Sequence, residues 1–182
     1  MLRVCFNLTF DEATERCVRS LWQRLADAGI TAPALPRYRP HVSLACYDVP
    51  DITVYEAGIA GVAAATPPFR IRLDSLGIFP EAGVVFLAPR VSCELFGLHR
   101  AIVHAFDGPG RPAVVDERLL PDFWMPHCTL AVRLTPEQML TVVDTCRRYW
   151  APLHGQAAGI GMRLLPAPRD HCHYPFQPSA ML

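Results

Sequence analysis

The hydrophobic pattern of the first half of the chain predicts strands and helices in turn. Val, Phe and Leu alternate loosely with polar residues over residues 2–10, as in a half-buried strand. From residue 11 to 28, apolar residues recur every three or four positions, which is the period of an amphipathic helix. Gly29 is the expected residue just past its end. A second strand is predicted at about 41–47 and a second helix over 51–65.

The second half continues this alternation. A Pro-Glu-Ala-Gly sequence at 80–83 predicts the turn of a β-hairpin. A Thr-Pro-Glu-Gln sequence at 135–138 predicts a helix start, with Thr as N-cap and Pro at the first helical position. The elements expected in this half are strands at about 69–74 and 84–88, a helix at about 92–106, a strand that starts at Pro126, a helix at about 135–150, and strands at about 157–165 and 171–177.

The predicted order is therefore β-α-β-α-β-β-α-β-α-β-β, and its second part resembles the first with one end trimmed. With 182 residues, of which 51% are hydrophobic and 19% charged, the chain has ample apolar residues for a core. We expect an α+β fold in which residues 1–182 form a single domain of two pseudo-symmetric lobes. Each lobe is expected to be an antiparallel sheet with outer helices, and a central cleft is expected between the lobes.

One hexapeptide occurs twice, once in each predicted lobe. The sequence Pro-His-Val-Ser-Leu-Ala at 40–45 returns as Pro-His-Cys-Thr-Leu-Ala at 126–131. Of the 7 His in the chain, only His41 and His127 have a hydroxyl residue two positions later. Because Pro cannot donate to a sheet ladder, each Pro is expected at the start of a strand.

Strand geometry gives each hexapeptide one polar and one apolar face. Side chains at positions i and i+2 point the same way, so His41 shares a face with Ser43, and His127 shares a face with Thr129. Such a set suits phosphoryl transfer, in which one neutral imidazole acts as base and one protonated imidazole as acid. The two hydroxyls could donate hydrogen bonds to phosphate oxygens as charge develops there.

Charge and cysteine content narrow the choice of partners. The 17 basic residues are all Arg, so the chain offers no Lys for a Schiff base or a Walker motif. They are balanced by 17 acidic residues, so no strong attraction to duplex DNA is expected. No apolar run approaches the roughly 20 residues of a membrane span, and the N-terminus does not have the pattern of a signal peptide. The 7 scattered Cys predict reduced core cysteines. We expect a cytoplasmic monomer without membrane contact.

With these two motifs, one early and one late in a chain of this size, the sequence resembles the two-histidine (2H) phosphoesterase superfamily, and in particular its bacterial 2′-5′ RNA ligase-like members. The resemblance implies a bilobal α+β fold around a central cleft. It also implies metal-independent hydrolysis of 2′,3′-cyclic or related nucleotide or RNA-end phosphodiesters, with reversible 2′-5′ ligation in some members. Carried over to this chain, it makes His41 and His127 the catalytic pair and Ser43 and Thr129 the phosphate-binding hydroxyls, with no cofactor or metal.

One position departs from the RNA-specific branch of that superfamily. That branch commonly carries Arg soon after the Leu-Ala of the second motif, whereas this chain has Val132 there and Arg133 one residue later. A small cyclic nucleotide or nucleotide-derived phosphodiester therefore stays open as the substrate beside an RNA end.

Aromatic and Arg residues next to the two motifs are further candidates for substrate contact. The aromatic rings could stack on a base, and the guanidinium groups could bind phosphate bidentately. Ordinary loop packing and solvated surface Arg are the alternatives. The candidates are Tyr38, Arg39, Trp124 and Arg133, together with Phe123 and Arg37.

Other histidines and cysteines offer weaker hypotheses. The His-Cys-His sequence at 171–173 suggests a metal site, but two His on one strand face lack an evident third ligand, so a structural role is favoured. His99 lies on the apolar face of its helix and is expected to be a core residue. Cys128 is expected to point away from His127, which argues against a Cys–His nucleophile.

Two alternative functions follow from the same residues. The chain could be a non-catalytic nucleotide- or RNA-binding module that keeps the fold, or an interaction domain in which the two imidazoles lie far apart.

Overall fold

The computed structural model describes residues 2–30, 38–106, 117–165 and 169–178. The predicted order of strands and helices is confirmed, and a 3-10 helix, η1, is an addition to it. The elements are β1 (Leu2–Phe10), α1 (Glu12–Asp27), β2 (His41–Val49), α2 (Thr53–Ala64), β3 (Phe69–Phe79), β4 (Val84–Pro89), α3 (Cys93–Phe106), η1 (Glu117–Leu119), β5 (Cys128–Ala131), α4 (Pro136–Tyr149), β6 (Leu153–Leu165) and β7 (Arg169–Pro175).

Helix termini form where short-range signals predict them. Asp11 caps α1 by accepting a hydrogen bond from the backbone N–H of Thr14 at 2.9 Å. Gly29 follows that helix with φ of 79°, a conformation that favours glycine. Thr135 and Gln138 form a reciprocal capping box at the start of α4.

All the strands belong to one antiparallel sheet. The hydrogen-bonded order is β2-β1-β6-β3-β4-β5, and β7 pairs with β6. The 13-residue strand β6 joins the two halves of the sheet. Its first residues, from Leu153 to Ala157, pair with β3, and its later residues, from Gly159 to Leu164, pair with β7. The α+β prediction with antiparallel strands is therefore confirmed.

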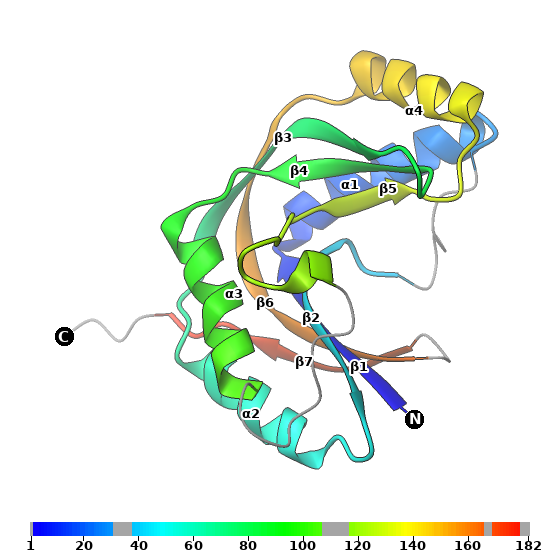
Figure 1. The fold of residues 1–182 in the computed structure, drawn as a ribbon. Coiled ribbons are helices and arrows are strands. Elements are labelled where there is room, and N and C mark those ends of the chain that lie inside the picture. The colour runs from blue at the N-terminus through cyan, green and yellow to red at the C-terminus, as the bar shows by residue number, and fades with distance from the viewer. Residues whose placement is uncertain (1, 31–37, 107–116, 166–168, 179–182) are drawn as a thin grey trace.

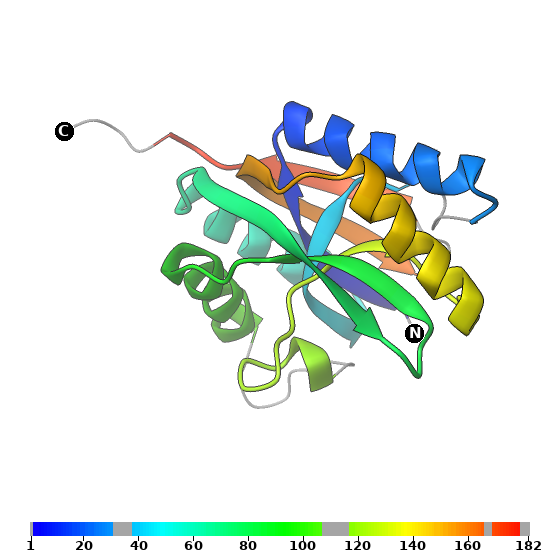
Figure 2. The same ribbon diagram turned by 90° about the horizontal axis from the view of Figure 1, so that it is seen from above.

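The sheet curves so strongly that its two terminal strands meet. Strands β2 and β5 stand at opposite ends of the hydrogen-bonded order, yet they contact each other (Figures 1 and 2). The helices cover the outside in two pairs. Helices α1 and α4 pack together over β4, β5 and β6, and α2 and α3 pack together over β2, β6 and β7. This arrangement places the start of each motif strand on the inside of the curve.

An aromatic cluster fixes α2 and α3 against the first two strands. Phe6 of β1 and Tyr47 of β2 pack against Tyr55 of α2 and Phe106 of α3. The Phe6 and Phe106 ring centroids are 5.0 Å apart, and both residues are at most 2% exposed. Such rings bury large areas, so this cluster contributes strongly to the attachment of the helix pair.

The prediction of reduced core cysteines is wrong for one pair. Cys5 of β1 and Cys46 of β2 are joined by a disulfide, with their Cα atoms 4.1 Å apart. They lie directly opposite each other in the antiparallel register. That register brings together residues 41 positions apart, and nothing in their spacing indicates it. The free cysteines among the described residues are Cys17, Cys93, Cys128, Cys146 and Cys172.

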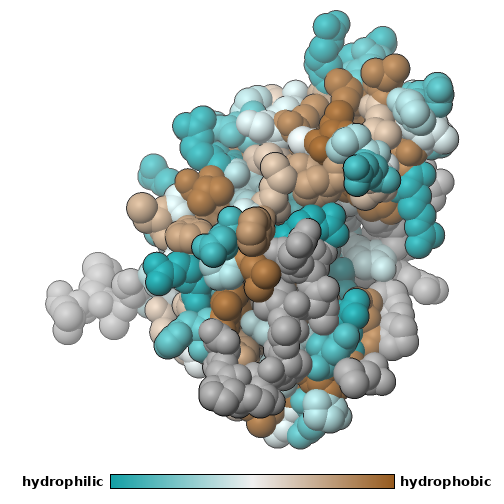
Figure 3. Space-filling model, viewed as in Figure 1, coloured by the Kyte–Doolittle hydropathy of each residue, from teal (hydrophilic) through white to brown (hydrophobic). Residues whose placement is uncertain are grey.

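The described surface is polar around the inside of the curve. Figure 3 shows a hollow between the part of the molecule that carries β3 to β5 and the part that carries β1 and β2, with hydrophilic side chains around it. Hydrophobic side chains gather over α4 and in smaller groups elsewhere on this face, and Leu140 of α4 and Ile78 of β3 are exposed. Among the described residues, no helix combines the length and the apolar character that crossing a membrane would require.

Candidate active site

The two hexapeptides adopt the alternating pattern expected of strands. The apolar residues Val42 and Leu44 are fully buried, as are Cys128 and Leu130. His41, Ser43, His127 and Thr129 are half-buried on the opposite side of the backbone. Each motif therefore anchors itself in the core through one set of side chains and presents an imidazole and a hydroxyl through the other.

Each motif histidine is held by the backbone in the same way. Nδ1 of His41 lies 2.7 Å from the carbonyl oxygen of Arg39, and Nδ1 of His127 lies 2.8 Å from the carbonyl oxygen of Met125. A carbonyl oxygen can only accept, so Nδ1–H is the donor in both cases. This bond fixes the orientation of each ring and places a proton on its Nδ1.

Several contacts tie the two motifs to each other. The indole N–H of Trp124 donates to the carbonyl oxygen of Ser43 at 3.2 Å. The Cys128 sulfur accepts a hydrogen bond from the backbone of His41. A charge on His127 also disfavours a charge on His41, although less than burial and Arg163 do. The curved sheet thus brings together two histidines that are far apart in sequence.

His41 is strongly biased towards its neutral form. Burial, followed by the nearby Arg163 guanidinium, lowers the pKa of His41 to about 4, although the Arg39 carbonyl and Asp170 act in the opposite direction. Near neutral pH this ring is therefore an uncharged imidazole. Its Nε2 carries a lone pair and can accept a proton.

His127 lies in an aromatic setting. Its ring meets Phe79 edge-on at a centroid distance of 5.1 Å, and the Phe86 ring lies 5.2 Å away. The Arg118 guanidinium lies over the first of these two rings, 5.4 Å from the centroid of Phe79. Sequence reasoning missed all three of these neighbours, because they come from β3, β4 and η1 and meet His127 only in the folded sheet.

The motif hydroxyls differ in their partners. Ser43 donates to the Asn7 side-chain oxygen at 3.2 Å across the β1–β2 pair. Thr129 is held through its backbone, because its carbonyl oxygen accepts a 3.1 Å hydrogen bond from the Trp22 indole. The structure therefore positions Ser43 through its side chain and Thr129 through its main chain.

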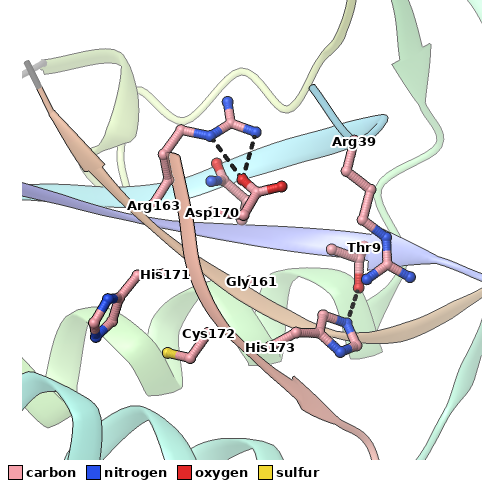
Figure 4. Close-up of a pocket in the computed structure, with 9 residues that line it drawn as sticks. Thr9, Arg39, Gly161, Arg163, Asp170, His171, Cys172 and His173 are labelled. Carbon is pink, nitrogen blue, oxygen red and sulfur yellow. Dashed lines mark hydrogen bonds and ion pairs between the residues drawn. The ribbon is translucent and has the colours of Figure 1, made fainter. Parts of the chain in front are cut away.

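A cavity of about 230 Å³ lies next to Arg39 and Thr9, close to the first motif, and none of the four motif side chains is among its lining residues. It lies on the motif face, which we define as the side of β1, β2, β6 and β7 that carries His41 and Ser43. The strand register places Thr9 opposite His41 and Asn7 opposite Ser43. On the same face, Gly161 pairs with Asn7 and with His173, and Arg163 pairs with Asp170. The lining residues are Asn7, Thr9, Arg39, Gly161, Arg163, Asp170, His171, Cys172 and His173 (Figure 4).

Two arginines line this cavity, and each is held by a carboxylate. Arg39 pairs with Glu15 of α1, and Arg163 pairs with Asp170 at 3.1 Å. The Arg163 guanidinium also lies 4.4 Å from the centroid of the Tyr38 ring. Arg39 therefore lines the cavity, whereas Tyr38 supports Arg163 with one face of its ring.

The remaining candidates from the sequence lie in different places. Trp124 stacks on the core residue His99, with ring centroids 4.0 Å apart, so its ring is used in packing. Phe123 is 67% exposed. Arg133 follows the far end of β5, beside the β3–β4 turn, and does not line the cavity. Arg37 lies outside the described residues.

His99 itself has the expected core position. The ring is fully buried, and its Nε2 hydrogen-bonds the Leu119 carbonyl oxygen at 2.9 Å. Its Nδ1 has no hydrogen-bond partner in the part of the chain that the structure describes.

The expectation that His171 and His173 share a strand face is wrong. The β6–β7 pairing shifts by one residue at this point, so His171 has no register partner. His171 instead hydrogen-bonds Glu56 of α2, while His173 stays on the motif face, with its Nε2 2.8 Å from the Thr9 hydroxyl oxygen. Glu56, His171 and Cys172 each offer one atom that could bind a metal ion, and these three atoms lie within 4.8 Å of one another. The sequence motif did not indicate Glu56, because it comes from α2.

Taken together, the geometry offers two oriented imidazoles, two hydroxyls and a nearby cavity with two tethered guanidinium groups. Such a set can move protons on and off a ligand and can donate several hydrogen bonds to its oxygens.

Comparison with solved structures shows what this fold is similar to. Protein TT0787 of Thermus thermophilus superposes with a TM-score of 0.64 at 18% identity, covering 98% of this chain and 100% of that chain. A phosphoesterase superposes with a TM-score of 0.58 at 15% identity, covering 96% and 98%. E. coli LigT in complex with 3′-AMP gives a TM-score of 0.57 at 14% identity, covering 96% and 97%. At these identities the likeness concerns the fold, and it confirms the expected 2H phosphoesterase-like architecture.

A comparison with curated protein sequences gives no match. The sequence model of the 2′-5′ RNA ligase superfamily matches residues 10–163, a range that includes both hexapeptides, β1's last residue and most of β6. The chain therefore belongs to the 2′-5′ RNA ligase superfamily.

Proposed function

We propose that the chain is a metal-independent phosphodiesterase that hydrolyses a 2′,3′-cyclic or related nucleotide phosphodiester, with His41 and His127 as its acid–base pair and Ser43 and Thr129 as its phosphate-binding hydroxyls. Membership of the superfamily supports phosphoesterase or RNA ligase-like chemistry in general. The observation that carries the finer proposal is the matched anchoring of the two rings. Both Nδ1 atoms are bound to a carbonyl two residues upstream, so the two rings are oriented by the same kind of contact.

The roles of the two imidazoles follow from their surroundings. His41 is neutral because its pKa is lowered to about 4, so it is the proposed base. A water molecule gives a proton to Nε2 of His41 while the water oxygen bonds to phosphorus. The bond between phosphorus and one ribose oxygen breaks, and that oxygen takes the proton on Nε2 of His127. The product is a nucleoside monophosphate, and proton exchange with solvent restores both rings.

Phosphate binding is assigned to the groups beside the rings. The hydroxyls of Ser43 and Thr129 are proposed to donate to the non-bridging oxygens, where negative charge develops during attack. The Trp22 indole holds Thr129 through its carbonyl oxygen, which supports this role because the contact does not use the Thr129 hydroxyl. Ser43 has one hydroxyl hydrogen, which it donates to Asn7, so this hydroxyl has to turn from Asn7 to the phosphate when a ligand binds.

Removal of either imidazole tests the proposal. We expect His41→Ala and His127→Ala each to lower kcat/KM for a nucleoside 2′,3′-cyclic phosphate by about 10²–10⁴-fold, the usual contribution of a general acid or base. The exposed His104 of α3 provides the matched control, because His104→Ala removes an imidazole on an outer helix. EDTA should leave turnover unchanged. Full activity in either motif variant, or a requirement for a divalent metal, would contradict the proposal, and binding without conversion would favour a nucleotide-binding module.

A further inference from the structure

A second cluster of reactive side chains lies between α2 and β7 and is distinct from the four motif residues. It consists of Glu56 of α2 with His171 and Cys172 of β7, and it has no part in the proposed reaction. The carboxylate is hydrogen-bonded to Nε2 of the His171 ring. One oxygen, one nitrogen and one sulfur atom, one from each residue, lie within 4.8 Å of one another. These three atom types are the usual protein ligands of zinc.

An irregularity of β7 brings the His171 and Cys172 side chains together. Neighbouring residues of a regular strand point to opposite faces of the sheet. The β6–β7 register shifts by one residue just before Cys172, so His171 is an extra residue without a partner on β6. Such a β-bulge re-aims a side chain, and here the ring reaches Glu56 on α2. Figure 4 shows the His171 and Cys172 side chains on one side of β7 and the His173 ring on the other.

The Cys172 thiol is held on the helix side of the sheet. Its register partner Met162 is fully buried, and the Cys172 side chain packs against the hydrophobic core. A hydrogen bond joins the thiol to the hydroxyl of Tyr174, which lies two residues further along the same face of the strand. Helix α2 packs on this side of β7. The sulfur is therefore fixed by packing, next to the helix that supplies the carboxylate.

The other two groups leave the cluster open to solvent. The Glu56 side chain is 35% exposed and the His171 side chain is 26% exposed. An ion can therefore enter from this side and keep a water molecule as its fourth ligand, a coordination known for zinc. Zinc–ligand bonds of about 2.0–2.3 Å place the ligand atoms of one ion roughly 3–4 Å apart. Small rotations of the two exposed side chains are enough to reach this geometry.

We propose that Glu56, His171 and Cys172 form a zinc site that ties α2 to β7. Without the ion, Nε2 of His171 carries the hydrogen that it donates to the carboxylate. Zn²⁺ takes the place of this hydrogen, the ring keeps its proton on Nδ1, and the thiol releases its proton to solvent and binds as thiolate. The carboxylate and the thiolate then balance the two positive charges of the ion. Mg²⁺ and Ca²⁺ prefer oxygen ligands and do not suit this site.

The proposal does not depend on the proposed function. Neither His41 nor His127 belongs to the cluster, so zinc binding is compatible with turnover that EDTA leaves unchanged. Its test measures metal binding and stability, and the outcome does not require any substrate to be converted.

Metal binding by the full chain tests the proposal. After removal of metal with EDTA, we expect wild type to bind one Zn²⁺ in competition with a chromogenic chelator, and Mg²⁺ not to displace it. Cys172→Ser, His171→Ala and Glu56→Gln should each lower the Zn²⁺ affinity at least about tenfold, since loss of even an outer partner costs that much. Cys17→Ser and His104→Ala are the matched controls, because they remove an exposed thiol and an exposed imidazole from other helices.

Cobalt(II) shows whether the sulfur is a ligand. Co²⁺ should give a thiolate-to-cobalt charge-transfer band in the near ultraviolet that Cys172→Ser lacks and Cys17→Ser keeps. Zn²⁺ should raise the Tm of wild type with increasing concentration, because an ion that binds only the folded chain stabilises it. No stoichiometric Zn²⁺ binding, or wild-type affinity in any of the three ligand variants, would overturn the proposal and leave Glu56 and His171 as a simple ion pair.

Discussion

At the residue scale, His41 shows how the fold changes the chemistry of a common side chain. Burial and the nearby Arg163 lower its pKa to about 4, while its ordinary value is near 6.5. We expect the His41 ring, assigned by its loss in His41→Ala, to stay neutral in an NMR titration until the pH approaches 4. In the pH profile of kcat/KM, the acidic limb should lie in the same region as this titration. A His41 ring that titrates near 6.5 would contradict this assignment of the base.

The same shift affects stability in a definite direction. Between pH 6.5 and about 4, the unfolded chain binds a proton at His41 that the folded protein does not. Protonation of His41 in the unfolded chain therefore decreases the free energy of unfolding as the pH falls through that range.

Single residues also show where sequence reasoning reaches its limit. The pairing of His41 with Ser43 and of His127 with Thr129 could be predicted, because strand alternation depends on neighbours two residues apart. The roles of Arg163 and His173 could not, since they depend on cross-strand register and on a one-residue shift beside His171. From its sequence position Trp124 is a reasonable candidate for base stacking. In the structure its ring stacks on His99, which lies on α3 in another part of the chain.

At the element scale, helix boundaries were predictable and strand partners were not. The caps at Asp11 and Thr135 act within one turn, so the sequence carries their full signal. The antiparallel pairing of β1 with β2 places Cys5 opposite Cys46, and spacing alone could not indicate this disulfide.

The β1–β2 disulfide gives a prediction for this pair of strands. It closes a loop of about 41 residues, for which a stabilisation of about 2–4 kcal/mol is typical. We expect the double variant Cys5→Ser/Cys46→Ser, or wild type under reducing conditions, to unfold at correspondingly lower urea concentration. Cys17→Ser is the control, because Cys17 is exposed on α1 and free. An unfolding free energy that does not respond to reduction would mean that the two thiols are not bonded in solution.

At the scale of the whole molecule, the curvature of the sheet creates the proposed site. The two motif strands are at opposite ends of the hydrogen-bonded order, and only the closing of the curve brings β2 against β5. The element order indicated two related halves, which is why the α+β architecture was predictable. The cavity close to the first motif is lined largely by β6 and β7, and it emerges only from the assembled sheet.

The central claim is that two imidazoles from opposite ends of the sheet act on one phosphodiester. The most direct measurement is an NMR titration of the histidine rings with a slowly hydrolysed nucleoside 2′,3′-cyclic phosphorothioate. We predict that the signals of His41 and His127 move together with one shared dissociation constant, while the exposed His104 on α3 does not respond. Movement of only one motif ring, or two different dissociation constants, would contradict the claim.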